Sequence, residues 1–550
     1  MSITNKISPS HKISRIILII AAALRLWHLG SVPPSLSLDE VSIGYNAYSI
    51  LKTGTDEYGY RFPLLLRAYD DWRPALYAYF VVPFIALIGL TPVAVRLPAA
   101  LMGIAAVAGT YLLVKELLKI ITADKSKEFK TEIIALSAAL LMAISPWHVY
   151  LSRLGHEANP GLTFFLFGGL FLLRRRYVIA GLLYALSLMS YQSEKIVIPV
   201  FLIGYTLWNW RTVWRDKKKA AIALVISLMV MAPFIVASVQ PGALIRFRAT
   251  NIFQAEQQRL EERANTYLAA RKSGDVIGRL RNSRYIVMGE IVLKQYASHF
   301  NPVWLFSNSG AEPHKVPRMG LLALWEILLV ATGLFILLVR KSYYRFTLFI
   351  VLWLLSGPVA AALTTDAPHA MRSYTMLPMW QAIGGIGAWQ LIQWLYPHKA
   401  VIVSFVALLT ILGISLLGKN YFILFPKEQS DSFQYALTQA IEYVEQNKSR
   451  YNTIVISNEE NLYQSYMFYL FHTSYSPNQY LARGGTLSGG FAEVHTIDNV
   501  QFRPINWTED QHMENSIFIG NLSDFPGDTA FDKEFPNRDN KVRVVSYVNK

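Results

Sequence analysis

The sequence predicts a mainly α-helical membrane protein that crosses the bilayer many times and ends in a small soluble α/β domain. Of its 550 residues, 53% are hydrophobic and only 16% are charged, against about 25% charged residues in an ordinary soluble domain. The apolar residues come in long blocks, a pattern typical of membrane spans. Hydropathy drops after residue 418, where we expect the soluble part to begin.

Eleven apolar blocks are the candidate spans. They lie at residues 13–30, 96–114, 131–151, 161–173, 177–191, 196–210, 219–240, 318–340, 344–364, 376–396 and 400–418. Several are shorter than the ~20 residues that a straight crossing needs. A further apolar stretch at 75–90 is expected to form an interfacial or re-entrant helix, which gives eleven crossings. Thirteen crossings would result if residues 75–95 held two short spans.

The orientation follows from the placement of Lys and Arg, which give the chain a net charge of +15. The basic residues cluster at the N-terminus and in the loops 115–130, 174–176, 211–219 and 340–345. Loops rich in Lys and Arg stay in the cytoplasm, so the N-terminus is predicted inside. The segments 31–95, 241–317 and 419–550 are then outside. This pattern predicts a multi-pass protein of the plasma (inner) membrane and argues against a nucleic-acid partner.

Two domains are predicted, a transmembrane domain at 1–418 and a soluble extracytoplasmic α/β domain at 419–550. The second domain has helical spacing over 427–448. Strand-like runs follow at 453–457, 516–520 and 542–548. No Gly-rich phosphate loop is found there, which favours a capping or acceptor-docking role. The chain has no Cys, so disulfides and thiolate metal sites are excluded.

Acidic side chains gather in two of the predicted outer segments. Asp39 and Glu40 follow the first span, at the start of a segment with helical spacing. A carboxylate there can act as a general base toward a hydroxyl, bind a divalent cation or simply cap the helix. His156 and Glu157 lie at the outer end of the third span, and a His–Glu pair can bind metal, relay a proton or orient a loop.

Two neighbours complete the second acidic motif, Arg153 and Asn159. Polar caps at the end of a span are the plain alternative for the whole motif. Two acidic clusters on one face of the membrane favour a functional site, because ionisable groups near spans tend to mark function.

Phosphate-binding candidates lie at the outer ends of later spans. Arg372 and His369 follow the ninth block, and Lys195 lies in another outer loop. Arg binds phosphate through two parallel hydrogen bonds, and its charge stabilises a phosphate leaving group. We therefore expect Arg372, with Lys195 and His369, to hold a lipid phosphate at the membrane surface.

Several motifs together resemble the protein O-mannosyltransferase superfamily of GT-C glycosyltransferases. The motifs are the Asp39–Glu40 pair, WRPALY at 72–77, RLPAALMG at 96–103, SRLGHEAN at 152–159 and HAMRSYTMLP at 369–378. The superfamily includes glycosyltransferase family 39 and the bacterial aminoarabinose transferase of lipid A, and the resemblance covers about residues 10–400. It implies a GT-C fold, a polyprenyl-phosphate sugar donor and inversion at the anomeric carbon.

The resemblance also implies roles for the candidate residues. Asp39 would activate the acceptor hydroxyl with Glu40 in support, while Arg372 would hold the donor phosphate. His156 and Glu157 take the place of a second acidic motif that contacts metal or acceptor in some relatives. An HE pair in place of DxD leaves a requirement for Mg²⁺ or Mn²⁺ open, so the metal site is unknown.

The sequence therefore predicts a membrane glycosyltransferase that moves a sugar from a polyprenyl-phosphate lipid to a hydroxyl of a protein, lipid or glycan. We expect Asp39, His156, Glu157 and Arg372 to line one outward cavity. Two alternatives stay open. One is an O-antigen polymerase or ligase, which the arginines of loop 241–317 favour. The other is a polytopic lipid or solute transporter. A transporter would carry its charged or broken segments at the bilayer midplane, whereas here the ionisable residues gather at one face.

Overall fold

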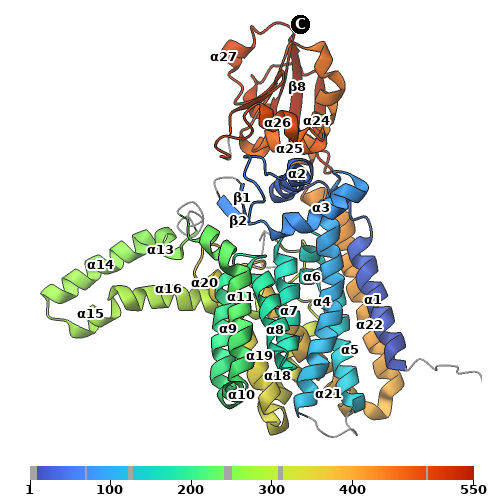
Figure 1. The fold of residues 1–550 in the computed structure, drawn as a ribbon, viewed down its shortest axis with the longest axis vertical. Coiled ribbons are helices and arrows are strands. Elements are labelled where there is room, and N and C mark those ends of the chain that lie inside the picture. The colour runs from blue at the N-terminus through green and yellow to red at the C-terminus, as the bar shows by residue number, and fades with distance from the viewer. Residues whose placement is uncertain are drawn as a thin grey trace, which may run out of the picture. The chain divides into compact units, whose positions relative to one another are not determined.

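The computed structural model describes residues 9–68, 71–121, 128–240, 250–307, 314–490 and 493–549. The chain divides into two compact units. The first, which we call the helical unit, comprises Met1–Leu24, Met102–Leu151 and Ala158–Leu416. The second, which we call the mixed unit, comprises Arg25–Leu101, Ser152–Glu157 and Leu417–Lys550. Figure 1 labels the elements of both units.

Helices of different lengths, most of them apolar, build the helical unit. They are α1 (Pro9–Leu26), α4 (Pro92–Ile121), α5 (Glu128–Ile144), α6 (Pro146–Ser152), α7 (Ala158–Leu173), α8 (Tyr177–Leu188), α9 (Glu194–Trp208), α10 (Trp210–Arg215), α11 (Lys217–Ser238), α18 (Glu326–Val339), α19 (Tyr344–Ser356), α20 (Val359–Ala362), α21 (Leu377–Trp394) and α22 (Lys399–Leu417). Of these, α1, α4, α6 and α22 run on into the mixed unit. Four more helices, α13 (Ile252–Ala255), α14 (Gln257–Lys272), α15 (Val276–Arg281) and α16 (Arg284–Ser298), form an arm, and α17 (Pro302–Phe306) follows it.

The length of the helices bears on the number of crossings. Among the described residues, four helices are long and apolar enough to span a bilayer, or five if the bent pair Lys130–Ile144 and Pro146–Ser152 is one span. Other predicted blocks form shorter apolar helices, such as α7 with 16 residues. Such a helix is about 24 Å long, less than the ~30 Å hydrocarbon core. The count of eleven crossings therefore stays a prediction.

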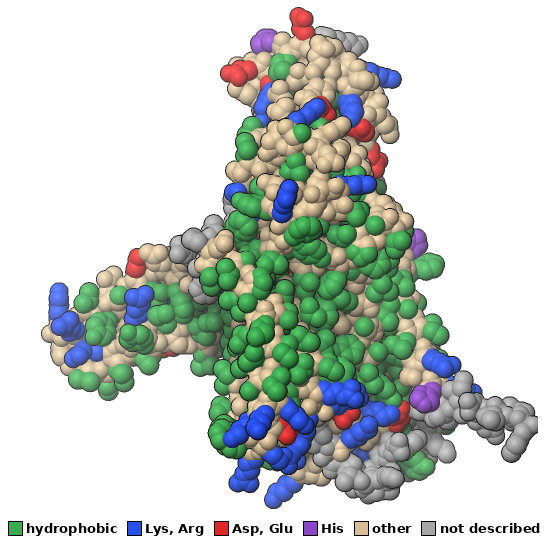
Figure 2. Space-filling model, viewed as in Figure 1, with side chains coloured by type: hydrophobic (Ala, Val, Ile, Leu, Met, Phe, Trp, Pro, Cys, Tyr) green, Lys and Arg blue, Asp and Glu red, His purple; other side chains and the backbone are tan. Residues whose placement is uncertain are grey.

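The stretch 75–90 forms a single helix, α3 (Leu76–Ile88), before α4 begins at Pro92. One helix in this region is what the interfacial interpretation requires, whereas the thirteen-crossing alternative requires two. Figure 2 also shows Lys and Arg side chains gathered at one end of the helical unit, beyond a broad apolar surface. This separation of charge along the helices is the pattern that the positive-inside rule describes.

The mixed unit combines the first outer segment with the C-terminal region. It contains α2 (Leu38–Thr53), β1 (Leu65–Ala68), β2 (Asp71–Pro74), α3, α23 (Phe425–Glu428), α24 (Tyr435–Asn447), β3 (Thr453–Ile456), α25 (Ser465–His472), α26 (Pro477–Ala482), β4 (His495–Ile497), β5 (Val500–Phe502), α27 (Trp507–Asp510), β6 (Ser516–Asn521), β7 (Lys533–Pro536) and β8 (Val542–Asn549). β1 and β2 form a two-stranded antiparallel sheet, and the other strands form a six-stranded sheet in the order β4-β5-β3-β6-β8-β7. β3 is parallel to both β5 and β6.

The predicted α/β character of the C-terminal region is confirmed. The helix predicted over 427–448 contains α24, and the three predicted strands are β3, β6 and β8. One hydrophobic core joins this region to the first outer segment, since Val41 of α2 and Val81 of α3 share it with Leu437 and Phe468. The compact unit is therefore larger than the predicted domain 419–550, because the sheet and its helices pack against α2 and α3.

Candidate active site

The acidic residues of the first outer segment lie in the first turn of α2. Ser37 caps this helix: its backbone N–H donates to Glu40 Oε2 at 2.9 Å, and its side-chain oxygen accepts from the Glu40 N–H at 3.4 Å. Such a capping box satisfies two backbone donors that a helix start leaves unpaired. Local sequence thus places Asp39 and Glu40 at the positive end of the α2 dipole.

Glu40 is only 1% exposed and forms a buried ion pair with Arg96. Arg96 Nε donates to Oε1 at 2.7 Å and Nη2 donates to Oε2 at 3.1 Å, while the Gly155 N–H donates to Oε1 at 2.8 Å. Burial alone would raise the pKa of Glu40, but the charge and hydrogen bonds of Arg96 hold it below the ordinary value. Glu40 is therefore an ionised carboxylate whose oxygens are already occupied.

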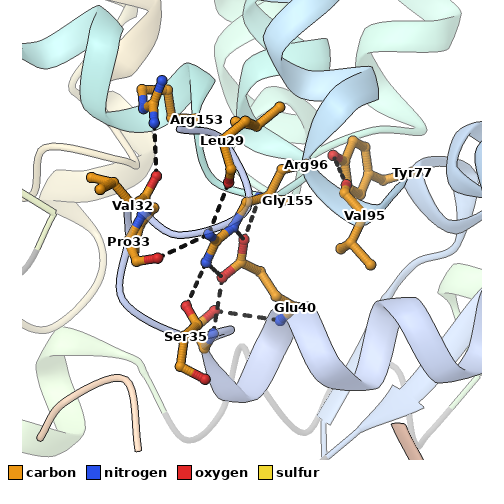
Figure 3. Close-up of polar contacts among 11 residues, drawn as sticks. Leu29, Val32, Pro33, Ser35, Glu40, Tyr77, Val95, Arg96, Arg153 and Gly155 are labelled. Atoms are coloured by element: carbon orange, nitrogen blue, oxygen red, sulfur yellow. Dashed lines mark hydrogen bonds and ion pairs between the residues drawn. The ribbon is translucent and has the colours of Figure 1, made fainter. Parts of the chain in front are cut away.

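Arg96 also binds the backbone that leads into α2. Its guanidinium donates to the carbonyl oxygens of Leu29, Pro33 and Ser35, as Figure 3 shows. The Glu40–Arg96 pair thus connects three segments: the start of α2, the start of α4 and the loop 152–157. These contacts fix the backbone at Glu40, and so also the position of its neighbour Asp39.

Asp39 differs from Glu40 because its side chain is 47% exposed. Its Oδ1 accepts from Arg73 Nη1 at 2.7 Å, and its Oδ2 lies 3.8 Å from His156 Nε2. His156 Nδ1 in turn lies 3.4 Å from Glu157 Oε2. The structure thus brings Asp39, His156 and Glu157 into one row with a solvent-facing carboxylate at its end. Such a carboxylate can accept a proton from an incoming hydroxyl.

Arg153, predicted beside this motif, has a different environment. It is fully buried, donates to the Val32 carbonyl oxygen at 2.8 Å, and stacks over the rings of Tyr421 and Phe422. These contacts fasten the loop 152–157 to the backbone before α2. The geometry supports a packing role for Arg153 rather than contact with an acceptor.

The residues around Asp39 do not fit a Mg²⁺ ion. Oxygen ligands are what Mg²⁺ prefers, but Asp39 faces the guanidinium of Arg73 and the nitrogen of His156. Among the residues that the structure describes, no three His, Asp or Glu side chains gather in a way that could hold a metal ion. We therefore assign no reaction step to a metal.

In the helical unit, Arg372 lies in the turn between α20 and α21. Its Nη1 donates to Thr364 Oγ1 at 2.8 Å and to the Thr365 carbonyl at 2.7 Å. Its backbone N–H donates to His369 Nδ1, and the His369 N–H donates to His299 Nε2 at 3.2 Å. Burial lowers the pKa of His299 to about 4, so a neutral His299 accepts this bond. Arg372 as a whole is half-buried.

Asn159 is buried at the start of α7 and accepts a hydrogen bond from Tyr374 at 3.1 Å. It therefore holds the segment that follows Arg372. Asp39 belongs to the mixed unit and Arg372 to the helical unit, so the expectation that both line one cavity stays a prediction.

Lys195 lies in the first turn of α9 beside an apolar cavity of about 640 Å³ between α8, α9 and α11. Its Nζ is 3.4 Å from Ser238 Oγ, at the end of α11, and 4.9 Å from the centre of the Phe234 ring. A cavity with apolar walls suits a hydrocarbon chain. Lys195 sits at the end of this cavity remote from Lys217, the first residue of α11.

Two site residues were missed by sequence reasoning, Arg73 and Arg96. Both occur in the motifs WRPALY and RLPAALMG, next to apolar blocks, and both are at most 4% exposed. Their positions carried a usable signal, because an arginine beside an apolar block must be paired when it is buried. The partner could not be read from the sequence, since Arg96 and Glu40 are 56 positions apart.

Comparison with known proteins bears on the class of the protein. Residues 72–236 match the family described as dolichyl-phosphate-mannose-protein mannosyltransferase. The fold is similar to that of ArnT from Cupriavidus metallidurans: the apo structure has a TM-score of 0.51 at 10% identity and covers 98% of this chain and 96% of that chain. The structure of ArnT bound to undecaprenyl phosphate has a TM-score of 0.50 at 12% identity, over 98% and 97%.

A third similar structure is the oligosaccharyltransferase AglB from Archaeoglobus fulgidus, in complex with an inhibitory peptide and a dolichol-phosphate. Its TM-score is 0.49 at 14% identity, and the match covers 84% of this chain but 63% of AglB. The chain thus spans less than two thirds of the length of AglB. No curated protein matches the sequence. The fold shared with ArnT confirms the predicted fold class, a helical GT-C fold, and the family match over residues 72–236 agrees with it.

Proposed function

We propose that this protein is an inverting glycosyltransferase that moves a sugar from a polyprenyl-phosphate lipid to an acceptor hydroxyl on the outer face of the plasma membrane. The observation that carries the proposal is the half-exposed Asp39, held by Arg73 and His156 beside the saturated Glu40–Arg96 pair. The family matched by residues 72–236 supports the same chemistry. Related lipids accompany its structural relatives, undecaprenyl phosphate for ArnT and dolichol-phosphate for AglB.

The reaction is a single displacement. The acceptor oxygen attacks the anomeric carbon and its proton passes to Asp39, while the bond between that carbon and the phosphate oxygen breaks. His156, which lies between Asp39 and Glu157, orients Asp39. Polyprenyl phosphate is the leaving group, and the acceptor is the hydroxyl of a protein, lipid or glycan.

The donor phosphate is bound by cations of the helical unit in this proposal. Arg372 has two polar partners that fix its guanidinium, and Lys195 lies beside an apolar cavity that can take part of the lipid tail. Positive charge at the leaving phosphate stabilises the transition state more than the ground state. His369, which accepts from the Arg372 backbone, holds the turn in shape.

Asp39→Asn tests the proposed base, because the amide keeps the size of the side chain and can still accept from Arg73. Transfer from radiolabelled polyprenyl-phosphate mannose, glucose and arabinose, measured in membranes, should fall by ~10²–10⁴-fold for whichever donor the wild type uses. Asp528→Asn, at an exposed carboxylate of the mixed unit, should keep full turnover. Turnover by Asp39→Asn at the wild-type rate would remove Asp39 from the mechanism.

Arg372→Gln tests the phosphate site, with Arg372→Lys as the matched variant that keeps the charge. We expect kcat/KM for the lipid donor to fall by ~10²–10³-fold in Arg372→Gln and by less in Arg372→Lys. Equal losses in both variants would show that the shape of the turn matters and the charge does not.

The orientation proposed from the basic loops is a cytoplasmic N-terminus and an extracytoplasmic C-terminal region. The chain has no Cys, so a single Asp528→Cys can be labelled without background. A membrane-impermeant maleimide should label it in intact cells, and labelling only after lysis would reverse the orientation.

A further inference from the structure

The arm formed by α13 to α16 has a very small core of its own. Ile252, Val287 and Ile291 form this core, with Phe253 and Leu260 packed against them. Arg263 joins α14 to α16 through Asn282 and Glu290. These contacts use one face of α16. On the opposite face, Tyr296 donates to the Leu355 carbonyl at 2.6 Å, while Tyr285, Gly289 and Leu293 are exposed.

That opposite face is apolar. Tyr285, Gly289, Val292, Leu293 and Tyr296 follow the i, i+4, i+7, i+8, i+11 pattern of one helical stripe, on the side away from Val287 and Ile291. At the tip, the short helix α15 exposes Val276, Ile277 and Leu280. Tyr285 is 86% exposed and Ile277 is 79% exposed. An exposed apolar surface of this extent marks contact with a partner or a membrane.

Positive charge surrounds the apolar tip. Between residues 271 and 284 the chain carries five basic residues, Arg271, Lys272, Arg279, Arg281 and Arg284, and one acidic residue, Asp275. Figure 2 shows Lys and Arg side chains at the end of the arm and apolar side chains along it. Basic residues that flank exposed apolar ones are the composition of helices that lie in a lipid headgroup layer, where each cation gains attraction to anionic lipid.

The position of the arm within the helical unit agrees with this composition. α11 has 22 residues, so it is about 33 Å long and matches the ~30 Å hydrocarbon core. Lys217, Lys218 and Lys219 begin α11, and the arm comes after its other end. In Figure 1, α14 and α16 run across the direction of α9 and α11, and α16 lies on the side of the arm toward the α10 end of those helices. The apolar stripe belongs to the helix on that side.

We propose that the arm is an interfacial lipid-binding element. Its α15 tip and the α16 stripe enter the boundary between headgroups and acyl chains of the outer leaflet, and the five tip cations contact lipid phosphates. The polar residues of α14, such as Gln258 and Glu262, remain in water. This proposal does not depend on the transferase activity.

Single-cysteine spin labelling tests the proposal on the full chain, which has no native Cys. Ile277→Cys and Leu293→Cys report on the apolar surface, and Asn265→Cys on α14 is the matched control. All three positions are exposed, so the label should leave the fold intact. In phosphatidylcholine vesicles containing phosphatidylglycerol, labels at 277 and 293 should collide several-fold more often with oxygen than with a water-soluble nickel chelate, and the label at 265 should show the reverse.

Two outcomes would overturn the proposal. Preferential access of the nickel chelate at 277 and 293 would place the surface in water. Spin–spin broadening that disappears when labelled protein is diluted with unlabelled protein would show that the surface binds a second copy of the chain. The charge contribution is tested by Arg279→Glu combined with Arg281→Glu, which should reduce the depth of the label at 277. An unchanged depth would remove the cations from the proposal.

Discussion

The Glu40–Arg96 pair offers the most direct test of how the site is held. Arg96→Met removes a charged side chain of similar length and with it five hydrogen bonds, two to Glu40 and three to the carbonyls of Leu29, Pro33 and Ser35. Arg96 is fully buried and Glu40 is 1% exposed, so water cannot replace these partners without opening the structure. Removing one partner of a buried pair costs about 3–5 kcal/mol.

Glu40 retains the N–H groups of Gly155 and Ser37 in this variant, which reduces the cost toward the lower figure. Even this lower cost is a large part of the free energy of unfolding of a typical domain. We therefore expect Arg96→Met to lower the thermal stability clearly. Purified protein in detergent, followed by circular dichroism and by loss of monodispersity, gives the measurement. Acidification should act in the same direction: the pKa of Glu40 is lowered in the fold, so its contribution is present above the unfolded pKa and is lost as pH falls through the folded one.

The double variant Glu40→Leu with Arg96→Met separates the ion pair from general loss of packing. It leaves no uncompensated charge, so its loss of stability should be smaller than the sum of the losses of Glu40→Leu and Arg96→Met. Additive losses would refute the reasoning, as would an Arg96→Met variant within about 1 kcal/mol of the wild type.

Two further predictions concern the mixed unit. Glu57 is buried with Asn46, Tyr466 and Thr486 as partners, and burial raises its pKa from 4.5 to about 7. The folded state therefore binds a proton more tightly than the unfolded state. This stabilisation, on the order of 3 kcal/mol, is complete below the unfolded pKa and is lost as pH rises through 7. Glu57→Gln should flatten that slope in unfolding measured from pH 5 to pH 8, and an unchanged slope would contradict the assignment. Gly155→Ala would place a Cβ 2.7 Å from Val95 Cγ1 and 3.0 Å from the Val95 carbonyl oxygen. Overpacking of this kind costs about 1–3 kcal/mol, and it should also lower turnover; wild-type stability and turnover would mean that the loop 152–157 shifts freely.

Features encoded locally could be predicted from the sequence. Ser37 followed by Glu40 is a helix-start signal, and α2 begins there. The strand predicted at 542–548 is observed as β8. It could be predicted because the alternation of apolar residues involves only neighbours along the chain. The chemical candidates His156 and Glu157 were also found, since charged residues at the end of an apolar block are conspicuous.

Features that depend on distant partners could not be predicted. Asp39 and Glu40 are adjacent and similar in type, yet one is half-exposed and the other is buried, because only Glu40 meets Arg96. The sequence predicts Arg153 in the second acidic motif, but it cannot show that the guanidinium stacks over Tyr421 and Phe422, which are more than 260 positions away. The contribution of α2 and α3 to the core of the C-terminal region has the same origin. In each case, packing between residues far apart in the sequence determines the environment of the side chain. The local sequence pattern holds no information about such packing.

The arm and the Arg372 turn are joined at both ends of the arm. The Thr365 N–H donates to the Thr250 carbonyl at 2.9 Å, and the Ile252 N–H donates to the Leu363 carbonyl at 3.3 Å. At the other end, His299 accepts from the His369 N–H. An arm held in the headgroup layer would therefore hold the turn of Arg372 at the depth where a lipid phosphate lies. If Arg372 binds the donor phosphate, as proposed above, then Arg279→Glu with Arg281→Glu should raise the KM for the lipid donor while kcat changes little, because these residues lie far from the reacting atoms. A change in kcat alone would argue that the arm does not act through donor binding.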